Sequence, residues 1–221
     1  MANSFKKFQK ASLAVLAQSN NCQESQDRFR AATSVPELVS AWQHYWGDMI
    51  KEVPEQTIAA LAEYYPAYRQ DINRAGLYFN EAPPIDAFPS IVLIGDKGSV
   101  CGDAIATLKI TGRHRVFVLG DLPVEVREEC SVYIGAERAN VSVYNTVRCT
   151  ISAGTVTAHD RSTVTGSGKI TSHDASTILI TGGTLEDNGH YSITAYNDAV
   201  VNSFTDRKIS ICDNAKLNIT K

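Results

Sequence analysis

Residues 159–178 read HDRSTVTGSGKITSHDASTI, and this stretch contains one six-residue pattern twice. The segment HDRSTV at 159–164 returns as HDASTI at 173–178. A repeat at a fixed spacing is the sequence signature of a fold built from one stacked supersecondary unit. This repeat therefore decides the fold of the second half of the chain.

Looser copies of the pattern lie on both sides of this stretch. Each copy has an Asp, Asn or Glu, then a small residue, then a Val, Ile or Leu, and the copies begin at Asp96, Glu128, Glu137, Asn197 and Asp213. Neighbouring copies are mostly about 14–16 residues apart, or half that distance. We therefore expect half-turns of about 7–8 residues, two of which form one coil.

The residues after each Asp or Asn alternate as a strand does. In segments such as TVT at 155–157 and at 163–165, the valine points to one side and both threonines to the other. A single strand of this kind cannot bury its apolar side, whereas stacked coils can. The expected interior row is Val156, Val164, Ile170, Ile178, Ile193, Val201 and Ile211.

The second half thus resembles the short-coil parallel β-solenoid, or β-helix, proteins over residues 91–221. An irregular β-sandwich is the alternative, because the repeat is degenerate. The fold class we expect is α+β, with a helical unit at 1–88 and a β-solenoid at 89–221 whose coils have about 14–16 residues.

The first half has the pattern of helices and holds most of the aromatic residues. Phe5, Phe8, Leu13 and Leu16 recur at helical spacing, Ser34 and Glu37 form a capping box, and further helices begin after Ser34 and at Pro54. We expect Gly47 to end the second of these helices and Pro66 to break the third. We expect this helical unit to cap the first solenoid coil, because an open end exposes apolar surface and strand edges.

Charge, hydropathy and cysteine usage restrict the partners. The net charge of −3 gives no electrostatic footprint for nucleic acid or an acidic membrane surface, and no apolar run is long enough to cross a membrane. The five cysteines are Cys22, Cys101, Cys130, Cys149 and Cys212, and no two of them form a CxxC pair. This pattern favours free thiols in a reducing, cytoplasmic compartment over export. No sequence motif predicts a cofactor.

Two pairs of residues invite a metal-binding interpretation. His159-Asp160 and His173-Asp174 would lie on neighbouring coils, but other copies of the pattern have Tyr144-Asn145 or Tyr196-Asn197 in the same place. A metal needs three or four converging ligands. We therefore expect these four residues to form solenoid corners rather than a metal site.

A dense aromatic set in the first half is the other candidate site. It comprises Trp42, Tyr45, Trp46, Tyr64, Tyr65 and Tyr68. Trp and Tyr are common anchors of protein interfaces, yet a helical unit of this size must also build its core from them. Core packing is the first interpretation, and Tyr64 and Tyr68 are the members expected at the surface.

The function expected from these features is a non-enzymatic protein–protein interaction module. Residues 42–48 (WQHYWGD) and 76–80 (GLYFN) are similar to uncharacterised proteins of bacterial mobile elements and phages, and this resemblance implies binding or inhibition of a host protein, as anti-defence factors do. The alternative is a glycan-binding or polysaccharide-cleaving β-helix using Asp121, Glu125, Glu128 and Glu129 with nearby basic residues. Coils of about 15 residues leave little room for a catalytic cleft.

The C-terminal coils suggest self-association. Residues 217–221 (LNITK) still alternate as a strand, so the last coil offers open edges to another molecule. We expect a homodimer formed through these coils.

Overall fold

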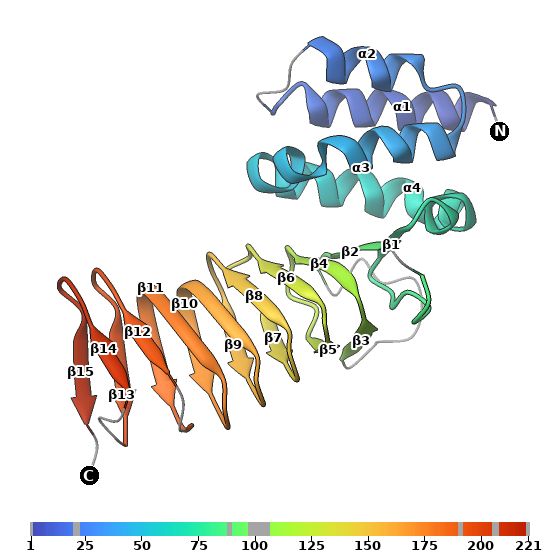
Figure 1. The fold of residues 1–221 in the computed structure, drawn as a ribbon. Helices are drawn as coiled ribbons and strands as arrows, with labels where there is room; N and C mark the ends of the chain where they lie inside the picture. The colour runs from blue at the N-terminus through green and yellow to red at the C-terminus, as the bar shows by residue number, and fades with distance from the viewer. Residues whose placement is uncertain are drawn as a thin grey trace. The chain divides into compact units, whose positions relative to one another are not determined.

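The computed structural model describes residues 2–19, 23–87, 90–96, 107–189, 192–204 and 208–219. The chain divides into two compact units, Met1–Phe79 and Asn80–Lys221. The first unit contains four helices and the second is a parallel β-solenoid, so the fold class is α+β as expected (Figure 1). That the helices cap the first coil stays a prediction.

The helical unit begins with the predicted amphipathic helix. Its elements are α1 (Ala2–Leu16), α2 (Gln23–Ala31), α3 (Val35–Glu52), α4 (Pro54–Arg74) and the short strand β1 (Leu77–Phe79). Ser34 caps α3 as predicted, because its hydroxyl accepts a hydrogen bond from the Glu37 N–H at 3.4 Å. The Glu37 carboxylate reaches back to accept the Thr33 N–H at 2.7 Å. None of the helices in the described parts of the chain is long and apolar enough to span a bilayer.

The predicted helix end at Gly47 is wrong, because α3 continues to Glu52. The predicted break at Pro66 takes the form of a kink, since two helical segments of α4 meet at Tyr68 (φ −123°, ψ 15°), two residues after the proline. Proline removes one helical hydrogen bond and bends a helix, and packing of the flanking turns can still hold both sides in helical geometry.

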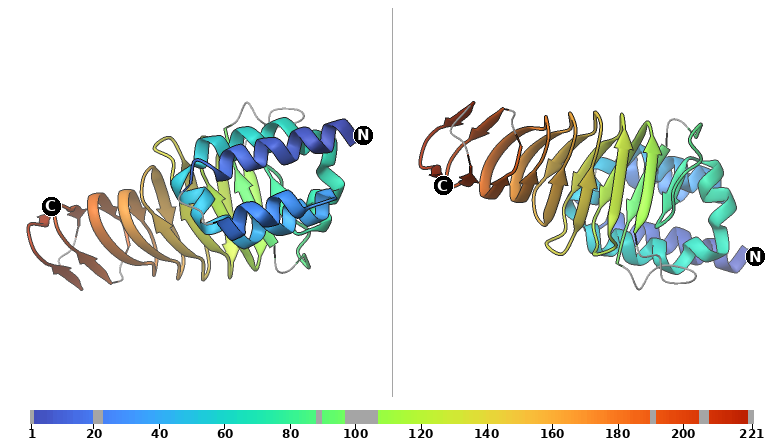
Figure 2. Two further views of the ribbon diagram at one scale, coloured as in Figure 1. Left: turned by 90° about the horizontal axis from the view of Figure 1, so that it is seen from above. Right: turned by 90° about the horizontal axis from the view of Figure 1, so that it is seen from below.

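The solenoid has two faces, each made of stacked parallel strands (Figures 1 and 2). The first face contains β2 (Ser90–Ile94), β4 (His114–Val118), β6 (Ser131–Ile134), β8 (Arg148–Ile151), the first halves of β10 (Thr163–Ser172) and β11 (Thr177–Asp187), β12 (Ile193–Ala195) and β14 (Ile209–Ile211). The second face contains β3 (Leu108–Gly112), β5 (Val124–Glu128), β7 (Asn140–Val143), β9 (Thr155–Ala158), the second halves of β10 and β11, β13 (Val200–Ser203) and β15 (Lys216–Ile219).

The register gives the coil length directly. From Val116 onward, paired positions along the first face are Val116, Val132, Cys149, Val164, Ile178, Ile193 and Ile209, with steps of 14 to 17 residues, close to the expected 14–16. The step before them, from Val92 to Val116, is longer, at 24 residues. The copy expected at 96–100 lies, apart from Asp96, outside the described residues.

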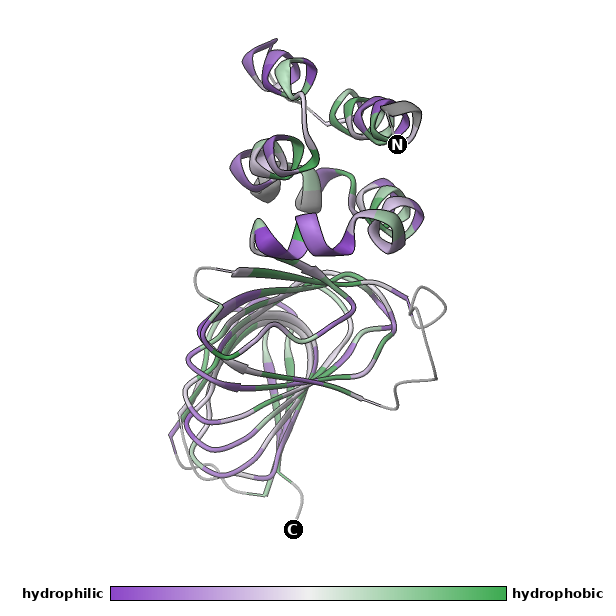
Figure 3. Ribbon diagram, turned by 90° about the vertical axis from the view of Figure 1, so that its right-hand side faces the viewer, coloured by the Kyte–Doolittle hydropathy of each residue, from purple (hydrophilic) through white to green (hydrophobic). Residues whose placement is uncertain are grey.

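Apolar and polar residues alternate along the coils (Figure 3). One side of each face is therefore apolar and buried, and the other side is more polar and exposed. Six of the seven predicted interior residues are at most 2% exposed: Val156, Val164, Ile170, Ile178, Ile193 and Val201. The seventh, Ile211, is 37% exposed, and this part of the prediction is wrong. Ile211 lies on β14, whose only partner among the described strands is β12, so no further coil covers it.

The interior of the solenoid also contains a buried carboxylate, and both of its oxygens are hydrogen-bonded. Asp187 is 5% exposed, and its carboxylate accepts from the Ser172 and Ser203 hydroxyls at 2.8 Å and from the Gly189 N–H at 3.0 Å. A buried carboxylate is tolerated when its oxygens are bonded in this way.

His114 is a second buried polar residue, only 2% exposed. Its ring nitrogens lie 2.6 Å from the Ser90 hydroxyl and 3.1 Å from the Thr111 carbonyl oxygen. Burial lowers the pKa of His114 below its ordinary value, so the ring is held in its neutral form.

Candidate functional site

One corner of the solenoid, where second-face strands lead into first-face strands, carries a row of residues with left-handed backbone. Glu128, Asn145, Asp160 and Asp174 have φ values of 68°, 57°, 55° and 54°. Asp and Asn tolerate this conformation better than most residues, which explains the choice of residue in the sequence repeat.

The side chains of these corner residues bond along the solenoid axis. The Glu128 N–H donates to Asn145 Oδ1 at 3.3 Å, the Asn145 N–H to Asp160 Oδ2 at 2.9 Å, and the Asp160 N–H to Asp174 Oδ2 at 3.2 Å. Each of these three amides therefore finds its acceptor on the following coil. Asp160 and Asp174 are the corner-forming residues that the repeat predicted.

The residues immediately before these positions form a stack. The Arg127 guanidinium lies 4.3 Å from the Tyr144 ring centroid. The Tyr144 and His159 rings are 4.5 Å apart and tilted by 3°, and the His159 and His173 rings are 4.8 Å apart and tilted by 6°. Arg127 is fixed from the other side by Glu125, whose Oε1 lies 2.6 Å from Arg127 Nε. We call the four stacked residues, together with Asn145, Asp160 and Asp174, the corner ladder.

The corner ladder is partly open to solvent. Tyr144, His159 and His173 are half-buried, whereas Asn145, Asp160 and Asp174 are exposed. Burial, followed by the proximity of His173, lowers the pKa of His159, while the Asp174 carboxylate pulls it in the other direction. Near neutral pH the ladder thus combines a guanidinium, a phenol and a neutral imidazole beside two exposed aspartates.

This geometry does not suit a metal. Stacked imidazoles have parallel planes, so their nitrogen lone pairs point side by side instead of converging on one point within about 2.1 Å. His159 Nδ1 lies 3.8 Å from Asp174 Oδ2, and this pair supplies two ligands where a metal needs three or four. In the described part of the chain, no group of three or more His, Cys, Asp or Glu residues converges on a possible metal position.

The aromatic set of the helical unit is largely internal. Trp42 is fully buried and its Nε1 donates to the Ser12 hydroxyl at 3.0 Å. Tyr45 is half-buried, with its ring 6.3 Å from that of Phe29. The Trp46 side chain lies outside the described residues. Trp42 thus belongs to the core and is not available to a partner in this structure.

Tyr64 and Tyr68 pack against the same phenyl ring. The Phe8 ring lies 5.0 Å from the Tyr64 ring and 5.9 Å from the Tyr68 ring, with both pairs stacked. Tyr64 is 9% exposed, so its predicted place at the surface is wrong, whereas Tyr68 is half-buried. The amphipathic pattern of α4 does not show which of its two tyrosines, Tyr64 or Tyr68, is the more buried.

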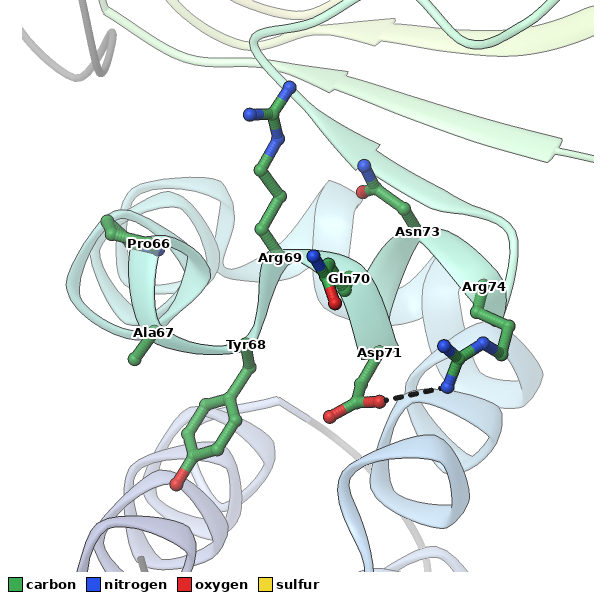
Figure 4. A pocket seen from close by; sticks show the side chains of 8 residues that line it. All are labelled: Pro66, Ala67, Tyr68, Arg69, Gln70, Asp71, Asn73 and Arg74. Atoms are coloured by element: carbon green, nitrogen blue, oxygen red, sulfur yellow. Dashed lines mark hydrogen bonds and ion pairs between the residues drawn. The ribbon is translucent and has the colours of Figure 1, made fainter.

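A pocket forms at the kink of α4 and is lined by residues 66–71, Asn73 and Arg74 (Figure 4). Tyr68 points to one side of the kink and Arg69 to the other, and Asp71 is paired with Arg74 at 3.3 Å (Figure 4). Because its acid and base partly neutralise each other, this pocket does not offer a concentrated charge to a ligand.

Two of the four acidic residues considered for polysaccharide cleavage are paired with neighbouring bases. Glu125 contacts Lys109 at 3.9 Å and Arg127 at 2.6 Å, and Glu129 contacts Arg113 at 2.6 Å.

Comparison of the chain with protein-family models, with curated proteins and with solved structures finds no match.

Proposed function

We propose that the chain is a non-enzymatic protein-binding module whose solenoid presents the corner ladder to a protein partner. Tyr and Arg are enriched at the energetic centres of protein interfaces. In the ladder both are already held in one conformation by stacking and by the Glu125 contact. A pre-organised surface loses little side-chain entropy on binding.

The observation that carries this proposal is the way the rings are stacked. Tyr144 lies between Arg127 and His159, and His159 lies between Tyr144 and His173. Sugar binding relies on free aromatic faces, and here these faces are covered. What the ladder offers to solvent is ring edges, polar atoms and charge, which suits the mixed polar surface of a protein better than a glycan.

The partner that we propose is a bacterial host protein. This finer proposal rests on the resemblance of residues 42–48 and 76–80 to mobile-element and phage proteins, and it determines the choice of bait material. The homodimer formed through the C-terminal coils is a separate proposal, supported by the exposed end of the solenoid.

The test is affinity purification from a bacterial lysate with the full chain as bait, run beside a glycan array. Arg127→Ala/His173→Ala removes both ends of the stack, whereas Arg148→Ala removes an exposed cation from the first face and serves as the matched control. We expect a stoichiometric protein to bind the parent chain and the control and to bind the double variant about tenfold or more weakly. Circular dichroism checks that all three chains remain folded.

Two results would count against the proposal. Equal binding of the partner by the double variant would remove the corner ladder from the interface. Glycan hits without a protein partner would favour the glycan-binding alternative.

A further inference from the structure

The last coil of the solenoid, formed by β14, β15 and residues 212–215, becomes more apolar where a coil facing water should become polar. Its inward positions pair with those of the preceding coil as Ile209 with Ile193, Ile211 with Ala195, Leu217 with Val201, and Ile219 with Ser203. Ile211 and Ile219 are 37% and 49% exposed. A solenoid coil that faces water needs a polar outer face, and the exposed Ile211 and Ile219 give this coil an apolar one.

The strand edges of this coil are also open. Among the described strands β14 pairs only with β12, and β15 pairs only with β13. A row of unpaired N–H and C=O groups beside large aliphatic side chains is a template for another strand.

We propose that a second copy of the chain covers this end, with β14 of each copy pairing antiparallel to β15 of the other across a twofold axis. The residue patterns of the two strands match in this register. Ile211 then faces Leu217 of the second copy, Ser210 faces Asn218, and Ile209 faces Ile219. Directly opposed residues of antiparallel strands lie on the same side of the sheet, so apolar meets apolar and polar meets polar.

A row of hydrogen-bonded side chains on the second face, Glu186, Asn202 and Asn218, favours pairing of β15 with β14 of the second copy over pairing of β15 with β15. Asn202 Nδ2 donates to Glu186 Oε1 at 2.5 Å, and Asn218 Nδ2 donates to Asn202 Oδ1 at 2.8 Å. These side-chain hydrogen bonds all run in one direction along the solenoid. The row therefore ends with the side-chain oxygen of Asn218, Oδ1, at the open end. Two such oxygens facing each other would lack a donor, whereas the Ser210 hydroxyl of the second copy supplies one.

Charge favours the same arrangement. In this register Lys216 lies beside Cys212 and Asp213 of the second copy, so each copy places a cation next to a carboxylate of the other. The twofold axis repeats this contact, and the assembly closes as a dimer instead of extending as a head-to-tail filament.

The mass of the full chain in solution is the first test. Light scattering across about 1–200 µM should show a change from the chain mass of 24.1 kDa towards twice that value, because an interface this small gives a weak dimer. Ile211→Lys/Ile219→Lys should remain monomeric throughout, since inward-facing lysines block edge pairing. Leu179→Lys, on the outer side of the first face, should dimerise as the parent chain does. A monomeric parent chain, or a control variant that fails to dimerise, would overturn the proposal.

Cysteine cross-linking tests the register itself. Within one copy Ser210 and Asn218 lie on the outer sides of opposite faces, about 10 Å or more apart, so a disulfide between them must join two copies. In a Cys212→Ser background, Ser210→Cys/Asn218→Cys should form a covalent dimer under mild oxidation, and neither single substitution should do so. Efficient cross-linking of Ser210→Cys alone or of Asn218→Cys alone would show that β14 pairs with β14, or β15 with β15, of the second copy. Either result would refute this register.

Discussion

Replacing Gly166 by alanine is expected to destabilise the solenoid, because this glycine has a backbone that other residues rarely adopt. Its φ is +132°, and it lies in the middle of β10, where the strand passes from the first face to the second. A Cβ atom added here would lie 1.8 Å from the Ile151 carbonyl oxygen on the neighbouring coil.

The magnitude follows from three contributions. The unfavourable φ costs about 1–3 kcal/mol. Moving the Ile151 backbone away from the new methyl group costs about 1–3 kcal/mol more, as overpacking in a dense interior does. The smaller entropy of the unfolded chain returns about 0.4–1 kcal/mol. We expect the free energy of unfolding to fall by about 1–6 kcal/mol.

Gly182 provides a matched control on the next coil. A Cβ there would meet only the Ser167 side chain, with the hydroxyl oxygen at 2.9 Å, and this hydroxyl can rotate away. Gly182→Ala gains the same unfolded-state entropy, so its stability should stay within about 0.5 kcal/mol of the parent chain. The difference in unfolding free energy between the two variants therefore measures the combined effect of the positive φ and the close approach at position 166.

Urea unfolding of the full chain, followed by circular dichroism in the β-sheet region, measures both variants. Hydrogen exchange of peptides from β8 and β10 then locates the loss, which should be concentrated in these two strands. If Gly166→Ala unfolds at the same urea concentration as Gly182→Ala, the close approach and positive φ are not what makes glycine necessary at position 166.

Three further outcomes are expected. Because burial lowers the pKa of His114 and His159, the unfolded chain binds their protons first, so the free energy of unfolding should fall as the pH drops from about 7 through about 6.5. Urea titrations at several pH values should show a weaker dependence for His114→Asn, and an unchanged slope would contradict this assignment. Burial raises the pKa of Cys149 to about 12, so peptide mapping after iodoacetamide treatment should find Cys212 alkylated in the native chain and Cys149 only after unfolding. Asp187→Ala should cost about 3 kcal/mol or more, since three buried donors lose their acceptor, whereas Asp187→Asn keeps part of the acceptor and should cost less; equal losses in a chemical denaturation assay would argue against these hydrogen bonds.

The solenoid could be predicted because its signal is repeated many times along the chain. Each copy of the pattern places an apolar residue inward and a polar residue at a corner, and six of the seven predicted interior residues are buried. The misplacement of Ile211 has a physical cause, since a periodic pattern does not show which copy lacks a covering coil. The predicted helix end at Gly47 failed for another reason: glycine disfavours a helix locally, but tertiary packing overrides this preference.

The candidate site was only partly predictable. The corner role of Asp160 and Asp174 followed from the repeat, and His159 and His173 were identified as residues that precede it. Glu128 was placed correctly in the repeat, but Arg127 was missed as the end of the stack because it was not aligned with residues 144, 159 and 173, which precede the same position in the other copies. Burial of Trp42 and Tyr64 depends on which helix face meets a neighbour, and spacing alone does not show this.

The hydrogen bonds of the left-handed corner residues impose an order on biosynthesis. The amides of Glu128, Asn145 and Asp160 are satisfied by side-chain oxygens encoded 14 to 17 residues downstream, so in a growing chain each of these corners waits for the next coil. A premature stop leaves one such turn without its acceptor. Excision of a whole winding lets the flanking turns join, and natural length variants should therefore differ by complete windings.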